Sequence, residues 1–225
     1  MSIVCKKWVR EDGPYPQPWE YVRDVIYKNN PFKGTFIEVG AHDGIKYSNC
    51  HFFESEWDWD GICIEPHFSN YNMLKENRKV PKYNCAVAEE DGGNLDFCYI
   101  EGEGDALSGL VKFFCKAHDK RINEIIRTHG GSTKTIVPIP IRSLSSLLQE
   151  NDIKKVDYLS IDCEGAEIPI LEGINFDEVD IRVLSVEYNR YPEGENDEDF
   201  RPYLISQGFD FLGRVCNDFI FIKTT

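Results

Sequence analysis

The stretch FIEVGAHDG, from Phe36 to Gly44, is typical of a buried strand that leads into a loop bounded by two glycines. Glycines at such a turn let the backbone approach a ligand closely. A dinucleotide site would require G-x-G-x-x-G after the strand. Here Gly40 is followed by Ala41, His42, Asp43 and Gly44, so that pattern is absent. An acidic loop would also repel a pyrophosphate, and the sequence therefore predicts a ligand that carries positive charge.

Composition limits the classes of function. The chain has 225 residues with 41% hydrophobic content, which fits one α/β domain over residues 1–225. A net charge of −14 argues against a nucleic-acid partner. No apolar run approaches the roughly 20 residues that cross a bilayer, and the first twelve residues lack a signal-peptide core. We expect no membrane partner and a cytoplasmic location. The eight cysteines form no C-x-x-C and are expected to be reduced, buried thiols.

Strand-like and helix-like segments alternate along the chain after an N-terminal arm and helix (residues 1–33, with the helix at 19–30). Strands are expected at 35–39, 61–65, 83–88, 94–100, 135–139, 156–161 and 181–187, and a hairpin at 209–215 and 219–222. Helices are expected at 48–56, 67–78 (opened by Pro66), 144–149, 167–172 and 199–207. Such alternation predicts a parallel sheet covered on both faces, with ligands at the carboxyl ends of its strands.

Residues 101–131 interrupt this alternation with glycines and a helical KAHDKRINEIIR. Long insertions over the carboxyl edge of a sheet often serve as lids or binding loops. A substrate lid and a helix without a role in the site, such as an oligomer contact, are equally weighted alternatives.

Acidic residues end three of the expected strands. Glu38 and Asp43 flank the first loop, Glu65 closes the second strand, and Asp162 closes the 156–161 strand, with Glu164 and Glu167 behind it. Glu65 follows Gly40 by 65 − 40 = 25 residues, close to the ~20 of nucleoside-binding folds. A carboxylate there can accept hydrogen bonds from both hydroxyls of a ribose, while acids near the loop favour the binding of an ammonium group. These features describe S-adenosylmethionine. The alternative is that Glu38 and Asp43 cap the following helix, which for Asp43 alone is the better explanation.

Six segments in order, FIEVGAHDGIKYSN, GICIEP, NCAVAEEDG, LSGL, YLSIDCEGAEIPIL and LSVEYN, resemble the FkbM family of S-adenosylmethionine-dependent methyltransferases. The resemblance covers about Thr35 to Ile222. It implies a Rossmann-like seven-stranded sheet, mostly parallel with an antiparallel last strand and helices on both faces. It also implies O-methylation, often of sugar or polyketide hydroxyls, so that the partner is a small-molecule or glycan acceptor.

The resemblance also assigns the cofactor contacts residue by residue. Glu38, Gly40, Asp43 and Asn49 would face the methionine part, Glu65 the ribose, Ala86 and Val87 the adenine, and Asp162 the sulfonium and acceptor, with Ala41, Gly44 and Pro66 completing the set.

Removal of the acceptor's proton needs a base. Asp162 is the first candidate, and Glu164, His42 and His118 are reserves, although His118 and His129 are better explained as polar residues of a surface helix. Asp162, Glu187 and Asn189 would instead hold a divalent metal in a catechol-type mechanism. Loop-holding hydrogen bonds of Glu187 and Asn189 are preferred to that metal.

Two other interpretations of the function compete with a methyltransferase. One is an inactive scaffold that keeps the fold. The other is an NAD-dependent enzyme, which the missing third glycine disfavours. The acidic run 193–199 is expected to be a solvated loop before a helix.

Overall fold

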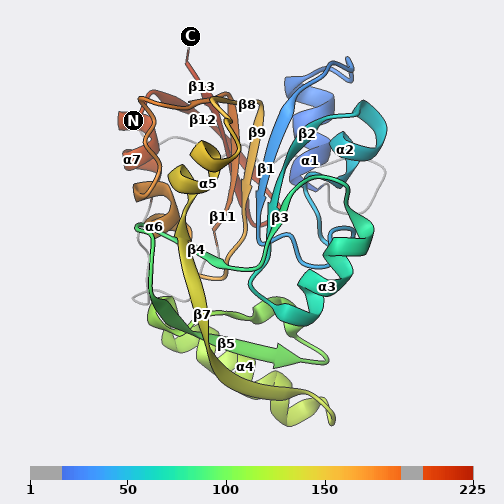
Figure 1. The fold of residues 1–225 in the computed structure, drawn as a ribbon, viewed down its shortest axis with the longest axis vertical. Helices are drawn as coiled ribbons and strands as arrows, with labels where there is room; N and C mark the ends of the chain where they lie inside the picture. The colour runs from blue at the N-terminus through green and yellow to red at the C-terminus, as the bar shows by residue number, and fades with distance from the viewer. Residues whose placement is uncertain (1–16, 189–199, 225) are drawn as a thin grey trace.

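A seven-stranded sheet forms the centre of the protein (Figure 1). The computed structural model describes residues 17–188 and 200–224. The strand order is β12-β13-β11-β9-β1-β2-β3. The bounds are β1 Thr35–Val39, β2 Asp60–Ile64, β3 Lys82–Tyr83, β9 Tyr158–Ile161, β11 Val183–Glu187, β12 Phe209–Val215 and β13 Asp218–Lys223.

The strand directions match the expected methyltransferase sheet. β1 pairs in parallel with both β2 and β9, and β11 pairs in parallel with β9. The last strand, β13, runs antiparallel to β11 and forms the predicted terminal hairpin with β12. The chain moves from β1 to β2 on one side and later returns to β9 on the other. The carboxyl end of β1 is therefore a topological switch point, where open α/β sheets bind ligands.

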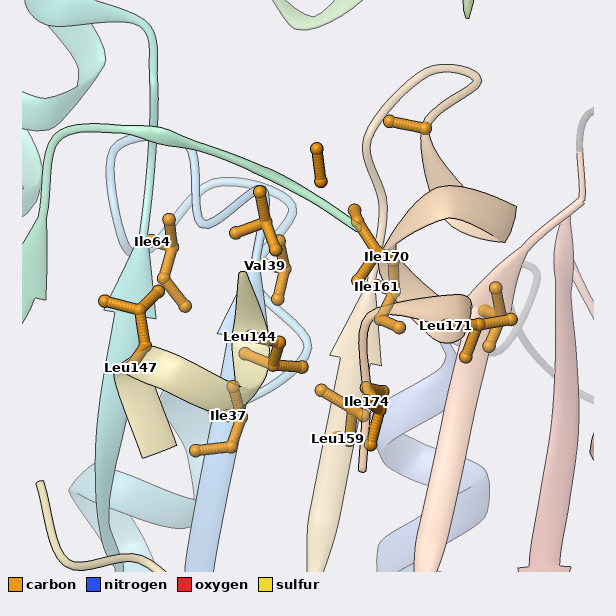
Figure 2. Packing of buried hydrophobic residues seen from close by; sticks show 14 of the residues in the cluster. Ile37, Val39, Ile64, Leu144, Leu147, Leu159, Ile161, Ile170, Leu171 and Ile174 are labelled. Carbon is orange, nitrogen blue, oxygen red and sulfur yellow. The ribbon is translucent and has the colours of Figure 1, made fainter. Parts of the chain in front are cut away.

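Helices cover both faces of this sheet because successive strand residues point to opposite sides. Phe36 and Tyr158 pack with Phe53 of α2 and Leu74 of α3 on one face. Ile37 and the other apolar residues of the opposite face pack with α5 and α6, as Figure 2 shows. The helices are α1 Pro18–Tyr21, α2 His51–Trp57, α3 Phe68–Asn77, α4 Lys116–Thr128, α5 Leu144–Glu150, α6 Glu167–Glu172 and α7 Arg201–Ser206, with a π-helix at Val22–Ile26 after α1.

A second, four-stranded sheet was not expected from the sequence. Its order is β4-β7-β5-β6, with β4 Ala86–Ala88, β5 Asn94–Glu101, β6 Gly109–Leu110 and β7 Thr133–Ser143. The helix α4 packs against this sheet through a separate apolar cluster that includes Cys98, Ile100 and Ile122 (Figure 1). The insertion 101–131 thus belongs to this second layer, which adjoins the carboxyl edge of the main sheet.

Several predicted elements need correction. The single strand 83–88 is wrong: β3 ends at Tyr83, and β4 joins the other sheet. The side-chain amide of Asn84 binds the carbonyls of Glu65 and Pro66 between them. Pro66 does not open the helix 67–78, since α3 begins at Phe68 and His67 is its N-cap, accepting from the Asn70 amide. The predicted strands 156–161 and 181–187 each break into two, because β8 Lys155–Val156 and β10 Asp180–Ile181 form a small sheet of their own.

Some predictions fall outside the described residues, namely the arm before residue 17, Asn189 and the run 193–199. Within the described ranges, none of the helices is long and apolar enough to cross a membrane.

Candidate cofactor-binding and active site

A cavity lies at the carboxyl ends of β1, β2 and β9. Its walls include Gly40 after β1, Glu65 and Pro66 after β2, Ala86 and Val87 of β4, and Asp162 and Glu164 after β9. The insertion closes a further side with Asp105, Ser108 and Leu110. The cavity therefore brings together predicted residues from four separate segments, and their contacts with a cofactor stay predictions.

Gly40 allows the first loop to lie directly against the end of β9. Its φ is +84°, and a Cβ there would be 1.8 Å from the carbonyl oxygen of Asp162. Its amide donates to the carbonyl of Ile64 at 3.0 Å, which joins the loop to β2 as well. A side chain at this position is excluded by both backbone conformation and space.

Glu65 is held firmly at the wall of the cavity. Its Oε2 accepts from the His42 amide at 2.8 Å, and its Oε1 accepts from the His67 amide at 2.7 Å. Burial, assisted by the nearby charges of Asp162 and Asp105, raises the pKa of Glu65 to about 8, although these two hydrogen bonds act to lower it. Each carboxylate oxygen has a second lone pair, so the group can still accept hydrogen bonds from a diol.

Glu38 lies outside the cavity lining and supports the loop from beneath. It accepts hydrogen bonds from the Ser48 hydroxyl and from the amides of Asn49 and Cys50. Its Oε2 also pairs with Arg78 at 2.8 Å, and Arg78 pairs in turn with Glu54. Since both oxygens of Glu38 already bind protein groups, the geometry favours a supporting role over contact with the methionine part.

Four other predicted contacts also lie outside the lining. Asp43 accepts from the amides of Ile45 and Lys46 within the loop and does not cap α2, whose N-cap is Cys50, so the capping alternative is wrong for Asp43. The other three face the protein interior. Ala41 is buried in the apolar cluster on the face covered by α2 and α3, and Gly44 packs against Leu74 and Arg78. The side-chain amide of Asn49 donates to the Ser160 hydroxyl. These residues shape the loop, and their direct contact with a ligand stays a prediction.

The candidate bases surround the same cavity. His42 has a left-handed backbone (φ 50°), and its Nε2 lies 3.1 Å from Asp105 Oδ2, while its buried Nδ1 has no hydrogen-bond partner. Asp162 is hydrogen-bonded to Glu187, and burial raises the pKa of both carboxyls. Burial also raises the pKa of Glu164 to about 8, with the charge of Asp162 as the next cause.

The prediction that His118 is a surface residue is wrong. His118 is 1% exposed because α4 turns this side chain toward the protein, where its Nδ1 lies 3.4 Å from Glu164 Oε2. The helical periodicity of KAHDKRINEIIR places His118 and Ile122 on one face, so the signal was present in the sequence. His129 is exposed as expected.

The metal alternative stays untested. Asp162 and Glu187 are adjacent, but Asn189 lies outside the described residues. Over residues 17–188 and 200–224, no three His, Cys, Asp or Glu side chains are grouped to hold a metal ion.

A mostly parallel sheet with an antiparallel last strand, and a cavity at its switch point, defines a Rossmann-like methyltransferase fold. The family model of the Methyltransferase FkbM domain matches residues 38–211, and the chain therefore belongs to this family. The resemblance found in the sequence is thereby confirmed.

The solved structures that this chain resembles have low sequence identity to it. Methyltransferase FkbM from Methylobacillus flagellatus KT matches with a TM-score of 0.53 and 11% identity, over 92% of this chain and 48% of that chain. The N-terminal domain of human METTL16 matches with a TM-score of 0.47 and 10% identity, over 98% of this chain and 75% of that chain. This chain thus spans about half the length of the bacterial relative. No curated protein matches its sequence.

Proposed function

We propose that the protein is an S-adenosylmethionine-dependent methyltransferase that methylates a hydroxyl of a sugar, a glycan or another small molecule. The observation that supports this most is the position of Glu65, buried in a cavity at the switch point beside the Gly40 loop. We further propose a cytoplasmic location, which the free cysteines of the described residues support.

The lining fits the parts of the methyl donor. Glu65 presents a carboxylate to the ribose hydroxyls, and Ala86 and Val87 give an apolar wall for the adenine. The Gly40 loop and Asp162 then border the methionine end and its sulfonium. When bound, this donor supplies an electrophilic methyl carbon, whose bond electrons return to sulfur as the acceptor oxygen bonds to carbon.

The chain's contribution is to orient the donor and acceptor and to exclude water. Alignment of two reactants of this kind contributes about 7–11 kcal/mol to lowering a barrier. Glu65 is fixed by two backbone amides, and Gly40 is fixed between β2 and β9. Both are therefore held in position before a ligand binds.

Calorimetry with S-adenosylmethionine, S-adenosylhomocysteine and NAD tests the cofactor assignment. We expect binding of the first two and none of NAD. Glu65→Ala should weaken the binding of S-adenosylhomocysteine at least about tenfold, since the hydrogen bonds from both ribose hydroxyls to the buried carboxyl are lost. Glu76→Ala, on the exposed side of α3, is the matched control and should bind as wild type. Unchanged affinity in a folded Glu65→Ala protein would contradict the assignment.

Product formation separates an enzyme from a scaffold that keeps the fold. The wild-type protein is incubated with the donor and a panel of hydroxylated acceptors, and methylated products are sought by mass spectrometry. Donor binding without methyl transfer to any member of a broad panel would favour the scaffold.

A further inference from the structure

A second cavity lies beside the first, on the side of β11. The insertion contributes Lys112, Phe113 and His118 to its wall, and Glu187 and Tyr188 at the end of β11 contribute the opposite side. Glu164 lines both cavities. This carboxyl therefore lies at the partition between the proposed donor site and a space that the donor does not need.

Glu164 and His118 form a buried pair at this partition. The Nε2 of His118 lies 3.0 Å from the carbonyl oxygen of Leu107, and a carbonyl can only accept, so Nε2 carries the hydrogen. In the neutral ring, Nδ1 is therefore the acceptor, and it faces Glu164 Oε2 at 3.4 Å.

Burial and the neighbouring charges determine whether the proton between Glu164 and His118 lies on the carboxyl or on the imidazole. Burial raises the pKa of Glu164 to about 8 and lowers the pKa of His118. Charged groups of the described residues that face the pair include Asp162, Glu167 and Glu187 beside Glu164, Arg121 beside both residues, and Asp119 and Lys134 beside His118. Because Nδ1 of the neutral ring is the acceptor, the proton between the two side chains lies on Oε2 of Glu164, and burial of both groups favours these neutral forms.

We propose that the second cavity binds the methyl acceptor, a polyhydroxylated compound without an anionic group, and that the Glu164–His118 pair removes the proton of the attacking hydroxyl. This inference rests on the proposed function. Glu164 is the catalytic residue of the pair, and His118 acts through it as a positioning residue.

The proton path balances at named atoms. As the acceptor oxygen loses its proton, Glu164 takes that proton on Oε1 and passes the proton of Oε2 to Nδ1 of His118. The carboxyl stays neutral throughout, and the imidazole becomes imidazolium. The positive charge lost at the donor is thus recovered on His118, whose Nε2–H remains bound to Leu107.

The lining limits the charge of the acceptor. Four carboxyls line the second cavity (Glu164, Glu167, Glu172 and Glu187), and Lys112 is the one Lys or Arg among its described lining residues. Aromatic rings of Phe113, Tyr188 and Phe200 supply apolar faces. Such a wall hydrogen-bonds hydroxyls or an amine, and with Lys112 as its one described basic residue it offers little positive charge to balance a carboxylate or phosphate.

The tautomer of His118 tests the pair without an acceptor or any turnover. In ¹⁵N-histidine NMR of the wild-type protein at pH 7, we expect His118 Nδ1 to be unprotonated and Nε2 protonated. Glu164→Gln keeps a donor to Nδ1 and should keep this tautomer, whereas Glu164→Ala should shift the Nδ1 resonance toward that of a water-exposed ring. A wild-type ring protonated at Nδ1 and bare at Nε2 would overturn the pair.

Acceptor charge is tested with three pyranoses, each of which differs from glucose in one substituent: methyl glucoside, glucosamine and glucuronate. Each is added at 50 mM to the protein saturated with S-adenosylhomocysteine, and the amide resonances of Phe113 and Gly165 are followed. We expect shifts with methyl glucoside or glucosamine and smaller shifts with glucuronate. Strongest shifts with glucuronate, or no shift with any of the three, would overturn the acceptor site.

Kinetic variants test the role of the pair on the best acceptor of the product panel. Glu164→Gln should lower kcat about 100-fold or more, and His118→Gln about tenfold or more, within the range of general-base effects. The kcat of His118→Gln should recover toward wild type as pH rises, because hydroxide then replaces the relay. His129→Gln, an exposed histidine after α4, is the matched control and should keep wild-type kcat.

Two results would contradict proton transfer through Glu164 to His118. One is a kcat of His118→Gln within twofold of wild type, and the other is a loss of kcat in His118→Gln that is equal at every pH. His118→Gln, whose side chain lines the second cavity and not the first, should bind S-adenosylhomocysteine within about threefold of wild type. If the wild-type protein itself does not bind the donor, the proposed function is contradicted. That result is distinguishable from a failure of the Glu164–His118 proposal alone.

Discussion

Gly40 is the single residue on which the geometry of the donor cavity depends most. It combines a left-handed backbone with an approach to Asp162 that leaves no room for a Cβ. Gly92 has a similar conformation (φ +100°) but no atom within 4 Å of its Cβ position. The two glycines therefore separate the effect of backbone conformation from that of steric contact.

Gly40→Ala should destabilise the fold more than Gly92→Ala. The left-handed backbone alone costs an alanine about 1–2 kcal/mol in either variant. In Gly40→Ala the clash with the Asp162 carbonyl adds to this, and the loop must leave β9, so affinity for S-adenosylhomocysteine should also fall. Urea denaturation and calorimetry of the two variants measure this. Equal destabilisation, with donor affinity retained in Gly40→Ala, would show that the close approach has no consequence.

The sequence was informative about which strand ends carry the site, and less so about which side chains face into it. Glu65 and Asp162 follow strands whose hydrophobic pattern is clear, so their positions at one sheet edge could be derived. Glu38 has the same sequence signal, yet its side chain points to Arg78, which is forty residues away in the chain. A partner so distant leaves no local pattern, and only the folded structure reveals it.

At the scale of elements, the insertion has its own small core. Ile122 of α4 is fully buried among residues of β5 and the loop that precedes β6. Because α4 also carries His118, the packing of this helix positions one wall of the second cavity.

Ile122→Ala should loosen α4 by about 2–5 kcal/mol, the usual effect of truncating a buried isoleucine. The loss should be local, since this cluster is separate from the two that cover the main sheet. Native-state hydrogen exchange should therefore show faster exchange of α4 amides while β1 and β9 keep their protection.

Ile136→Ala is the matched control for this change. Ile136 lies on the same second sheet, in β7, but is 46% exposed, and its truncation should leave α4 protected. Uniform loss of protection across both sheets in Ile122→Ala would contradict a separate core for the insertion.

The alternation of strands and helices was sufficient to predict the main sheet and its terminal hairpin. It was not sufficient for the second sheet, because β4 has only three residues and pairs with β7, more than fifty residues further along the chain. The break between β3 and β4 depends on the Asn84 side chain binding the turn after β2, a contact that periodicity does not encode. Short strands with distant partners are where a sequence-based prediction fails.

At the scale of the whole molecule, the site is an accumulation of buried carboxyls in an acidic protein. Burial raises the pKa of Glu65 and Glu164 to about 8 and that of Glu167 to about 7. In the unfolded chain these groups ionise near their ordinary pKa of 4.5. Between these values the folded protein binds more protons than the unfolded chain, so the free energy of unfolding falls as pH rises.

The range from pH 6.5 to 8 shows this effect when wild type is compared with a variant of one carboxyl. The buried histidines His67 and His118 have lowered pKa values, so they add a slope of the opposite sign while the histidines of the unfolded chain lose their protons just above 6.5, and this slope is common to both proteins. The buried cysteines with raised pKa values contribute mainly above their ordinary value of 9. Carboxyls with lowered pKa values, such as Asp91, have completed their ionisation far below this range.

The wild-type protein without ligand should therefore lose stability from pH 6.5 to 8, and Glu164→Gln should reduce that loss. One carboxyl contributes at most about 1.4 kcal/mol per pH unit, or about 2 kcal/mol over the range. The glutamine amide stays neutral and donates to His118 Nδ1 as the protonated carboxyl does, so the variant should match wild type at pH 6.5 and exceed it at pH 8. Urea denaturation across this range measures the difference. Parallel profiles for the two proteins would mean that Glu164 is already ionised at pH 6.5, contrary to its burial beside Asp162.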